Sequence, residues 1–251
     1  LDAGMGIVGV NIAIAETGSI IIVTNEGNEG LVSSLPPIVV AIMGMEKLVT
    51  SIDDAVNILD VLPKSATGQK ITSYISILTG LNNYNASDGR QFHIIILDNG
   101  RTRMKEDPIL KDALNCIRCG ACMNVCPTYK IVGGHVFGHI YPGPIGIPWT
   151  DKIHGFEEAA SFSPLCISCG LCEHACPVDI DIPMMIASIK HRDVEINGQF
   201  KINRILGDSD TTARMLSSTS PFSNWFLRRR FIRQMIEKFI GIDRRRPLPR
   251  F

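Results

Sequence analysis

The sequence predicts an α/β domain followed by a helical domain that holds every cysteine of the chain. Strand-length apolar runs separated by turn residues fill residues 1–104, whereas all eight cysteines lie between Cys116 and Cys176. The length of 251 residues suits one or two domains, and 45% hydrophobic residues are enough to build a core. We therefore expect domains at 1–104 and 105–200, followed by a tail at 201–251.

The α/β domain is predicted from short apolar runs and from one helix signal. Five runs have the length of strands: Val8–Ala15, Ser19–Thr24, Ile38–Met43, Ile71–Leu78 and Phe92–Leu97. The segment Glu16-Thr17-Gly18 predicts a hairpin turn between the first two runs. Ser51, with Asp53 and Asp54 after it, predicts a helix that continues through about Leu62.

The eight cysteines form two copies of the motif C-x2-C-x2-C-x3-C-P, and each position recurs 50 residues later. The copies contain Cys116, Cys119, Cys122 and Cys126, and then Cys166, Cys169, Cys172 and Cys176. This spacing is typical of two [4Fe–4S] clusters, in which the first three thiolates of a motif bind one cluster and the fourth binds the other. The ligands of one predicted cluster are Cys116, Cys119, Cys122 and Cys176, and those of the second are Cys166, Cys169, Cys172 and Cys126.

Zinc and disulfides are weaker interpretations of the same cysteines. Zinc sites usually pair two C-x2-C units across a longer gap, and disulfides belong to secreted chains, whereas this sequence shows no signal peptide. The 39 residues between Cys126 and Cys166 give room for helices around the clusters, so we expect a helical ferredoxin domain. Pro183 is expected to open a short helix over Met184–Lys190.

No catalytic residue is identified from the sequence. The segment Gly4–Gly9 matches G-x-G-x-x-G, but β-rich residues follow it where a dinucleotide site needs a helix. We therefore expect any flavin to be bound by a partner. The first motif contains the cation Arg118, whereas the second contains the carboxylate Glu173. Because positive charge favours the reduced form of a cluster, we predict the higher reduction potential for the first cluster. The alternative is that solvent screens these charges.

The neutral total charge hides a strongly basic tail. Residues 224–251 contain eight Arg and one Lys against one Glu and one Asp, a net charge of +7. Apolar residues recur every three to four positions over Phe231–Ile240, which predicts an amphipathic helix with a basic face. Such a helix docks on a partner, packs on its own ferredoxin domain or lies on an anionic membrane surface.

The charge balance and hydropathy also bear on partners and location. A neutral chain argues against nucleic acid as a partner of the whole protein. No apolar run approaches 18 residues, so no membrane-spanning helix is expected. The predicted location is the cytoplasm, with residues 224–251 able to make peripheral contact at the inner membrane face.

Several segments together resemble the lactate-utilisation iron–sulfur proteins of the LutB/LldF type. The segments that carry this resemblance, beside the cysteine motifs, are Gly9–Gly18, Thr24–Asn28, Met43–Lys47, Ser65–Gln69, Leu97–Arg101, Gly133–His135 and Tyr141–Gly146. In that family a LUD domain, similar to ribose-5-phosphate isomerase and CoA-transferase-like folds, precedes a helical ferredoxin domain. The family's LUD domain has further residues ahead of this match, so 1–104 corresponds to its C-terminal part.

The resemblance implies an iron–sulfur electron-transfer subunit of a complex that oxidises L-lactate, a 2-hydroxyacid, to pyruvate. It implies two partners, a cysteine-rich subunit and a second LUD protein, with the substrate chemistry on a partner. The alternative function is an electron-relay and assembly subunit of another flavoprotein/quinone or heterodisulfide-reductase-like oxidoreductase. The identity of the neighbouring subunits would discriminate between the two.

Overall fold

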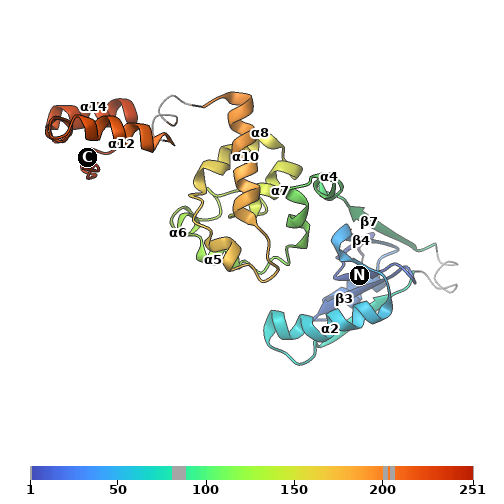
Figure 1. Ribbon diagram of the computed structural model, residues 1–251. Coiled ribbons are helices and arrows are strands. Elements are labelled where there is room, and N and C mark those ends of the chain that lie inside the picture. The colour runs from blue at the N-terminus through green and yellow to red at the C-terminus, as the bar shows by residue number, and fades with distance from the viewer. Residues whose placement is uncertain (1, 81–88, 200–202, 204–206, 251) are drawn as a thin grey trace. The chain divides into compact units, whose positions relative to one another are not determined.

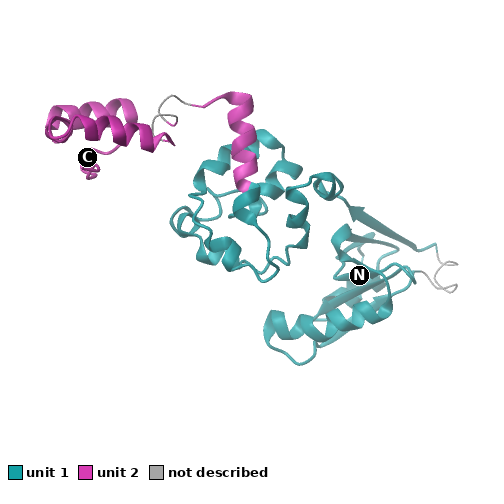
Figure 2. Cartoon of the chain, in the orientation of Figure 1, with its two compact units in different colours: residues 1–185 teal, residues 186–251 magenta. Residues whose placement is uncertain are grey.

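The computed structural model describes residues 2–80, 89–199, 203 and 207–250 (Figure 1). Contacts divide the chain into two compact units, Leu1–Met185 and Ile186–Phe251 (Figure 2). The first unit contains two sheets and the cysteine motifs, and the second contains the helices of the tail. The domain boundaries expected at 104/105 and 200/201 stay predictions.

Two sheets build the α/β region. A parallel three-stranded sheet has the order β1-β4-β7, with strands β1 (Met5–Gly9), β4 (Ile38–Gly44) and β7 (Gln91–Leu97). A four-stranded sheet has the order β5-β2-β3-β6, with strands β2 (Ile12–Ile14), β3 (Ser19–Thr24), β5 (Leu48–Val49) and β6 (Tyr74–Leu78). Strands β2 and β3 are antiparallel, which confirms the predicted hairpin.

The prediction of one strand over Val8–Ala15 is wrong, because the chain changes sheets in the middle of that run. The Val10 amide donates to the Ile42 carbonyl in the parallel sheet, and the next amide, of Asn11, donates to the Ile21 carbonyl in the other sheet. The Asn11 side chain fixes this crossing, since its Oδ1 accepts the Val23 amide at 2.9 Å. The alternation of apolar residues alone did not reveal the crossing.

The two sheets pack against each other over one shared apolar core. It contains alternate residues of both sheets: Val8, Val10, Ala13, Ile20, Ile22, Val39, Ala41 and Met43. The opposite face of β2 and β3 packs against α2 (Ile52–Thr67), where Ala55 is fully buried. These layers explain why the strands of the sequence are short and alternately apolar.

Helix α2 begins as predicted and ends five residues later than predicted. Ser51 and Asp54 form a capping box, in which each side chain accepts the other's backbone amide. The helix continues through Pro63 and ends at Thr67, and it is capped by Gly68, whose φ of 71° is left-handed. Proline lacks the amide that helix continuation needs, so the expected end at Leu62 was reasonable, but the helix tolerates the missing bond.

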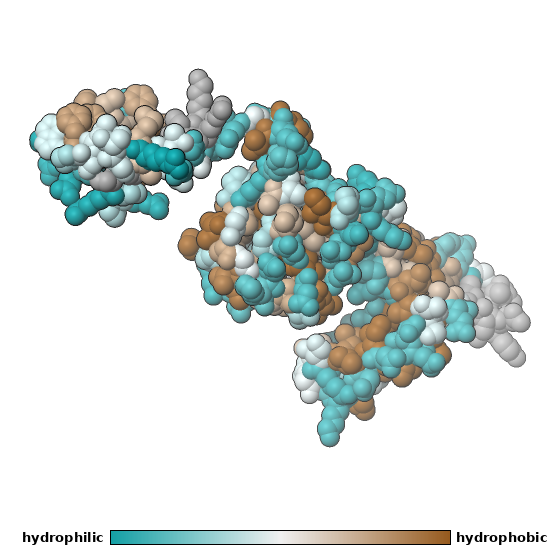
Figure 3. Space-filling model, viewed as in Figure 1, coloured by the Kyte–Doolittle hydropathy of each residue, from teal (hydrophilic) through white to brown (hydrophobic). Residues whose placement is uncertain are grey.

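Helix α1 (Asn28–Ser34) gives a packing reason for part of the glycine pattern at Gly4–Gly9. A Cβ on Gly6 would lie 2.2 Å from the carbonyl oxygen of Val32 in this helix. The glycine therefore permits a close helix–strand approach. Strands β6 and β7 carry several exposed apolar side chains, and Figure 3 shows brown surface over the α/β region.

Short helices surround the cysteine motifs, as expected for a helical ferredoxin domain. They are α4 (Arg101–Glu106), η2 (Leu110–Asn115), α5 (Ala121–Val125), α6 (Pro127–Val132), α7 (Gly146–Ile153), α8 (Phe156–Phe162), η3 (Ser163–Leu165) and α9 (Leu171–His174), and the longer α10 (Ile182–Asn197) follows them in the sequence. Helix α10 is 16 residues long, so the prediction of a short helix over Met184–Lys190 was wrong about its length. Nothing in the sequence before Gly198 stops it.

The second unit contains α12 (Ser209–Ser218), α13 (Phe222–Leu227) and α14 (Arg230–Ile240). Helix α14 confirms the amphipathic helix predicted over Phe231–Ile240. Among the described residues, no helix combines the length and hydropathy needed to cross a bilayer.

Candidate metal centre

The first cysteine motif forms a tight loop that leads into α5. Arg118 and Gly120 have φ values of 60° and 77°, which turn the backbone around the Cys116 thiol. The Arg118 amide donates to Cys116 Sγ at 3.4 Å, and Cys122 is buried in the first turn of α5. A left-handed arginine is unfavourable in isolation, so the loop geometry must be stabilised by its surroundings.

The second motif repeats this geometry almost residue by residue. Ser168 and Gly170 have φ values of 55° and 78°, and the Ser168 amide donates to Cys166 Sγ at 3.4 Å. Cys172 is buried in α9, which follows at once. The two copies of the motif, 50 residues apart, adopt the same strained loop at the same register, which indicates one structural requirement for both.

The fourth cysteine of each motif also accepts a backbone hydrogen bond. Cys126 Sγ caps α6 by accepting the Tyr129 amide at 3.5 Å, and Cys176 Sγ accepts the Ile180 amide at 3.4 Å. Amide donors stabilise charge on sulfur, which is the arrangement needed around iron–sulfur thiolates.

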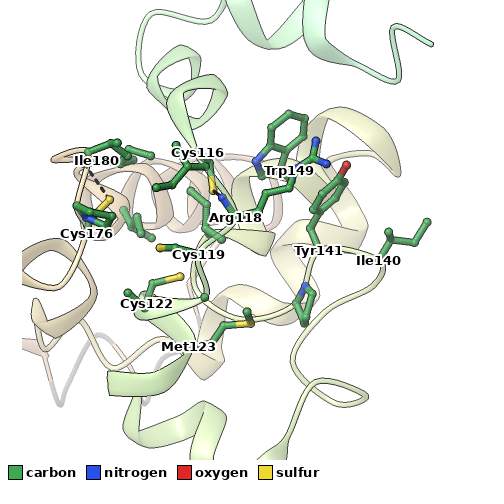
Figure 4. Close-up of a pocket in the computed structure, with 18 residues that line it drawn as sticks. Cys116, Arg118, Cys119, Cys122, Met123, Ile140, Tyr141, Trp149, Cys176 and Ile180 are labelled. Carbon is green, nitrogen blue, oxygen red and sulfur yellow. Dashed lines mark hydrogen bonds between the residues drawn. The ribbon is translucent and has the colours of Figure 1, made fainter. Parts of the chain in front are cut away.

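The structure gathers the thiols into two sets of four. One cavity of about 260 Å³ is lined by Cys116, Cys119, Cys122 and Cys176, and Figure 4 shows their sulfur atoms around this space. A smaller cavity of about 20 Å³ is lined by Cys126, Cys166, Cys169 and Cys172. Each cavity thus combines three cysteines of one motif with the last cysteine of the other, which is the arrangement expected from the spacing.

The two sets lie beside each other. Helices α5 and α9, which carry Cys122 and Cys172, are in contact. Burial raises the pKa of the Cys172 thiol to about 12, and the nearby Cys166 and Cys122 contribute to that rise. Burial also raises the pKa of Cys116 and Cys122. These thiols therefore need a bound cation to ionise at neutral pH.

The donor set of the larger cavity fits an iron–sulfur cluster better than a single metal ion. A single Zn²⁺ lies about 2.3 Å from each sulfur, so its ligands must converge on one point. Across the described ranges, no group of three or more His, Cys, Asp or Glu converges in that way. The larger cavity instead separates its four thiols around a space of several atoms, and apolar side chains such as Ile145 and Trp149 form part of its lining.

An ion-pair cluster fastens the C-terminal end of α4 to α7. Lys152 Nζ lies 2.8 Å from Asp107 and 3.0 Å from Asp151, and its side chain is 15% exposed. Arg103 donates to the Lys152 carbonyl at 2.7 Å. Although burial opposes it, the bonds to Lys152 hold the pKa of Asp107 below its usual value, and the carboxylates raise the pKa of Lys152.

Replacing Lys152 with Met is expected to lower the free energy of unfolding by about 3 kcal/mol, because two partly buried carboxylates lose their cation. Thermal and urea denaturation followed by circular dichroism would measure this. Because the pKa of Asp107 is lower in the folded protein, its carboxylate stabilises the fold fully above its unfolded-state pKa of about 3.9. This stabilisation is lost as the pH falls through its folded-state pKa.

The matched control is Lys64→Met, which breaks an exposed pair with Asp60 that also measures 2.8 Å. Its side chains are 51% and 70% exposed, so we expect a change of less than about 0.5 kcal/mol. Equal effects of the two changes would contradict a structural role for the Lys152 cluster.

Sequence reasoning missed a group of residues around the first motif. Glu46 accepts a hydrogen bond from Arg118 at 2.6 Å, so this arginine is neither a free nor a merely solvated charge. Tyr141 and Trp149 stack with ring centroids 5.0 Å apart and line the larger cavity. Glu46, Arg101 and Tyr141 lie in segments that carried the family resemblance, which was the only signal for them.

The fold and the thiol sets together define an iron–sulfur protein with an α/β domain ahead of a helical cysteine-rich domain. Comparison of the sequence with known protein families identifies the same two parts, since residues 1–97 match the LUD domain and residues 112–180 match the 4Fe-4S dicluster domain. The chain belongs to the lactate-utilisation iron–sulfur protein family.

Two relatives illustrate the similarity. "Lactate utilization protein B" of Bacillus velezensis is 41% identical over 222 residues, which cover 88% of this chain and 46% of that protein. The protein of the same name from Shouchella clausii is 45% identical over 195 residues, covering 77% of this chain and 40% of that protein. The chain thus spans less than half the length of these relatives.

A solved structure of a duf162 family protein from Deinococcus radiodurans also matches, at 19% identity over 38% of this chain and 54% of that chain. Its TM-score is 0.28, which is too low to support any argument.

Proposed function

We propose that this chain is the iron–sulfur electron-transfer subunit of a complex that oxidises L-lactate to pyruvate. The observation that carries the proposal is the division of eight thiols into two adjoining sets of four, each completed by the other motif's cysteine. When bound, two [4Fe–4S] clusters exchange single electrons with their surroundings. The names of the relatives support lactate as the source of those electrons.

The residues of the chain have three roles in this proposal. The eight cysteines hold the clusters, and the amides of Arg118, Tyr129, Ser168 and Ile180 stabilise charge on sulfur. Apolar side chains, among them the buried Ile145 and Trp149, line the larger cavity. With every thiol engaged as a ligand, this site has no open position for substrate, so a partner carries the substrate chemistry.

The partners are part of the proposal. Lactate loses two electrons and two protons to become pyruvate, so a partner must accept that pair before single electrons pass on; any flavin would be bound there. We propose a cysteine-rich subunit and a second LUD protein as these partners. The basic tail supports docking on them, because Phe231 and Phe239 of α14 are 69% and 64% exposed beside its arginines.

The test is reduction of the native assembly by substrate. We expect anaerobic addition of L-lactate to bleach the visible iron–sulfur absorbance, and D-lactate to leave it unchanged. Bleaching by neither isomer, with dithionite still able to reduce the protein, would contradict the lactate proposal. That result would favour a relay in another flavoprotein/quinone or heterodisulfide-reductase-like system. Sedimentation with anionic vesicles would show whether the tail binds a membrane surface instead of a partner.

A further inference from the structure

The parallel sheet directs two charged residues toward the first cysteine motif. Glu46 lies in η1 (Met45–Lys47), directly after β4, and Arg101 begins α4, shortly after β7. Both follow the carboxyl ends of parallel strands, the edge at which α/β folds place their functional groups. This edge of the LUD domain therefore adjoins the loop between Cys116 and Cys119.

Glu46 contacts one arginine with each carboxylate oxygen. Its Oε1 lies 2.6 Å from Arg118, and its Oε2 lies 2.8 Å from Arg101 Nε, an ion pair without the geometry of a hydrogen bond. The Arg101 side chain is 6% exposed, and that of Glu46 is 30% exposed. Burial opposes the charge of Glu46, but its backbone and the two arginines hold its pKa below the usual value.

Aromatic rings fix both guanidinium groups beside the larger cavity. Arg118 lies over the Tyr141 ring at 5.3 Å, and Arg101 lies over the Trp149 ring at 5.2 Å. The two rings stack on each other and line the cavity. The carboxylate, the cations and the rings thus form one unit, called here the Glu46 bridge, that joins the sheet edge to the first thiol set.

We propose that Glu46 is a positioning residue that holds Arg118 against the Cys116 loop and lowers the reduction potential of the cluster bound there. Reduction adds negative charge to a cluster, so a nearby cation favours it and a nearby carboxylate opposes it. Glu46 offsets the charge of Arg118, for which the sequence alone identified no counter-ion. The second motif has Ser168 at the position that Arg118 occupies in the first, so we expect the effect on the cluster of the Cys116 set. The inference rests on the proposed two-cluster function.

The test is redox titration of the full-length protein, with each cluster followed by its EPR signal. In Glu46→Gln, the amide preserves the shape and still accepts a hydrogen bond from Arg118. We expect the cluster of the Cys116 set to become easier to reduce by about tenfold in the ratio of reduced to oxidised protein, equivalent to about 59 mV. Arg118→Gln is expected to shift the same cluster in the opposite direction.

The double variant and the second cluster are the controls. In Glu46→Gln with Arg118→Gln, we expect the potential to return close to that of the unchanged protein, because one negative and one positive charge have both been removed beside the cluster. Asp60→Asn removes an exposed carboxylate of α2 and should move neither potential. Shifts that are absent or equal in both clusters would overturn the inference, and so would a double variant whose potential stayed as far from that of the unchanged protein as the potential of Glu46→Gln.

The outcomes separate this inference from the proposed function. Protein without iron, or with clusters that L-lactate cannot reduce in the assembly, would contradict the proposed function. If L-lactate reduced the clusters but neither Glu46→Gln nor Arg118→Gln shifted a reduction potential, only the role of Glu46 would be contradicted. If Glu46→Gln failed to retain iron, the redox titration of Arg118→Gln would still test whether the Glu46–Arg118 pair sets the potential of this cluster.

Discussion

Changing Cys122 to Ser is expected to remove about half of the iron, or about four of eight atoms per chain, if each thiol set holds one [4Fe–4S] cluster. Cys122 is buried in α5 and lines the larger cavity, so no solvent ligand can easily replace its thiolate. Cys172→Ser in α9 is expected to remove the other half. Iron analysis and EPR of the reduced protein would measure both losses.

The fourth cysteines decide whether the ligand sets cross between motifs. Cys176 belongs to the second motif but lines the cavity of the first, so Cys176→Ser should weaken the same EPR signal as Cys122→Ser. Likewise, Cys126→Ser should weaken the same EPR signal as Cys172→Ser, because both cysteines line the smaller cavity. Ser168→Gly keeps every thiol and should keep all of the iron. If Cys176→Ser instead weakened the same signal as Cys172→Ser, its neighbour in the second motif, the crossed arrangement of ligands would be wrong.

Changing Gly146 to Ala is expected to destabilise the protein by about 3 kcal/mol, at the upper end of what overpacking costs. A Cβ at Gly146 would lie 1.8 Å from the backbone carbonyl oxygen of Tyr141, which cannot yield as a flexible side chain could. Tyr141 would have to move, together with the stacked Trp149 and the wall of the larger cavity. Thermal denaturation and iron content would report the two consequences.

The matched control for Gly146 is Gly30→Ala in α1. No atom lies within 4 Å of a Cβ built there, and its backbone is not left-handed. Alanine in such a helix position is neutral or stabilises by up to about 1 kcal/mol. Iron retention and unchanged stability in Gly146→Ala would contradict the close approach of Tyr141.

The cysteine sets and most strands could be predicted because local patterns encode them. A thiol motif with fixed spacing specifies its own loop, and the hairpin at Glu16-Thr17-Gly18 follows from a turn between two apolar runs. The crossing at Asn11 could not be predicted, because it depends on which sheet accepts each of two neighbouring amides. Periodicity reports burial and does not report strand partners.

The charge around the first motif was the harder prediction. Arg118 was recognised as a cation beside the thiols, but its counter-ion is 72 residues away in sequence. Only the folded sheet brings Glu46 to it, at the end of β4. Long-range ion pairs carry no local sequence signal, and so the predicted effect of Arg118 omitted the residue that offsets it.

The most direct measurement is the iron and acid-labile sulfide content of the full-length protein, purified without oxygen. The two thiol sets predict about eight of each per chain, and EPR of the reduced protein should show two interacting [4Fe–4S] clusters. About four of each would show that only one thiol set holds a cluster. Zinc in place of iron would contradict the electron-transfer account altogether.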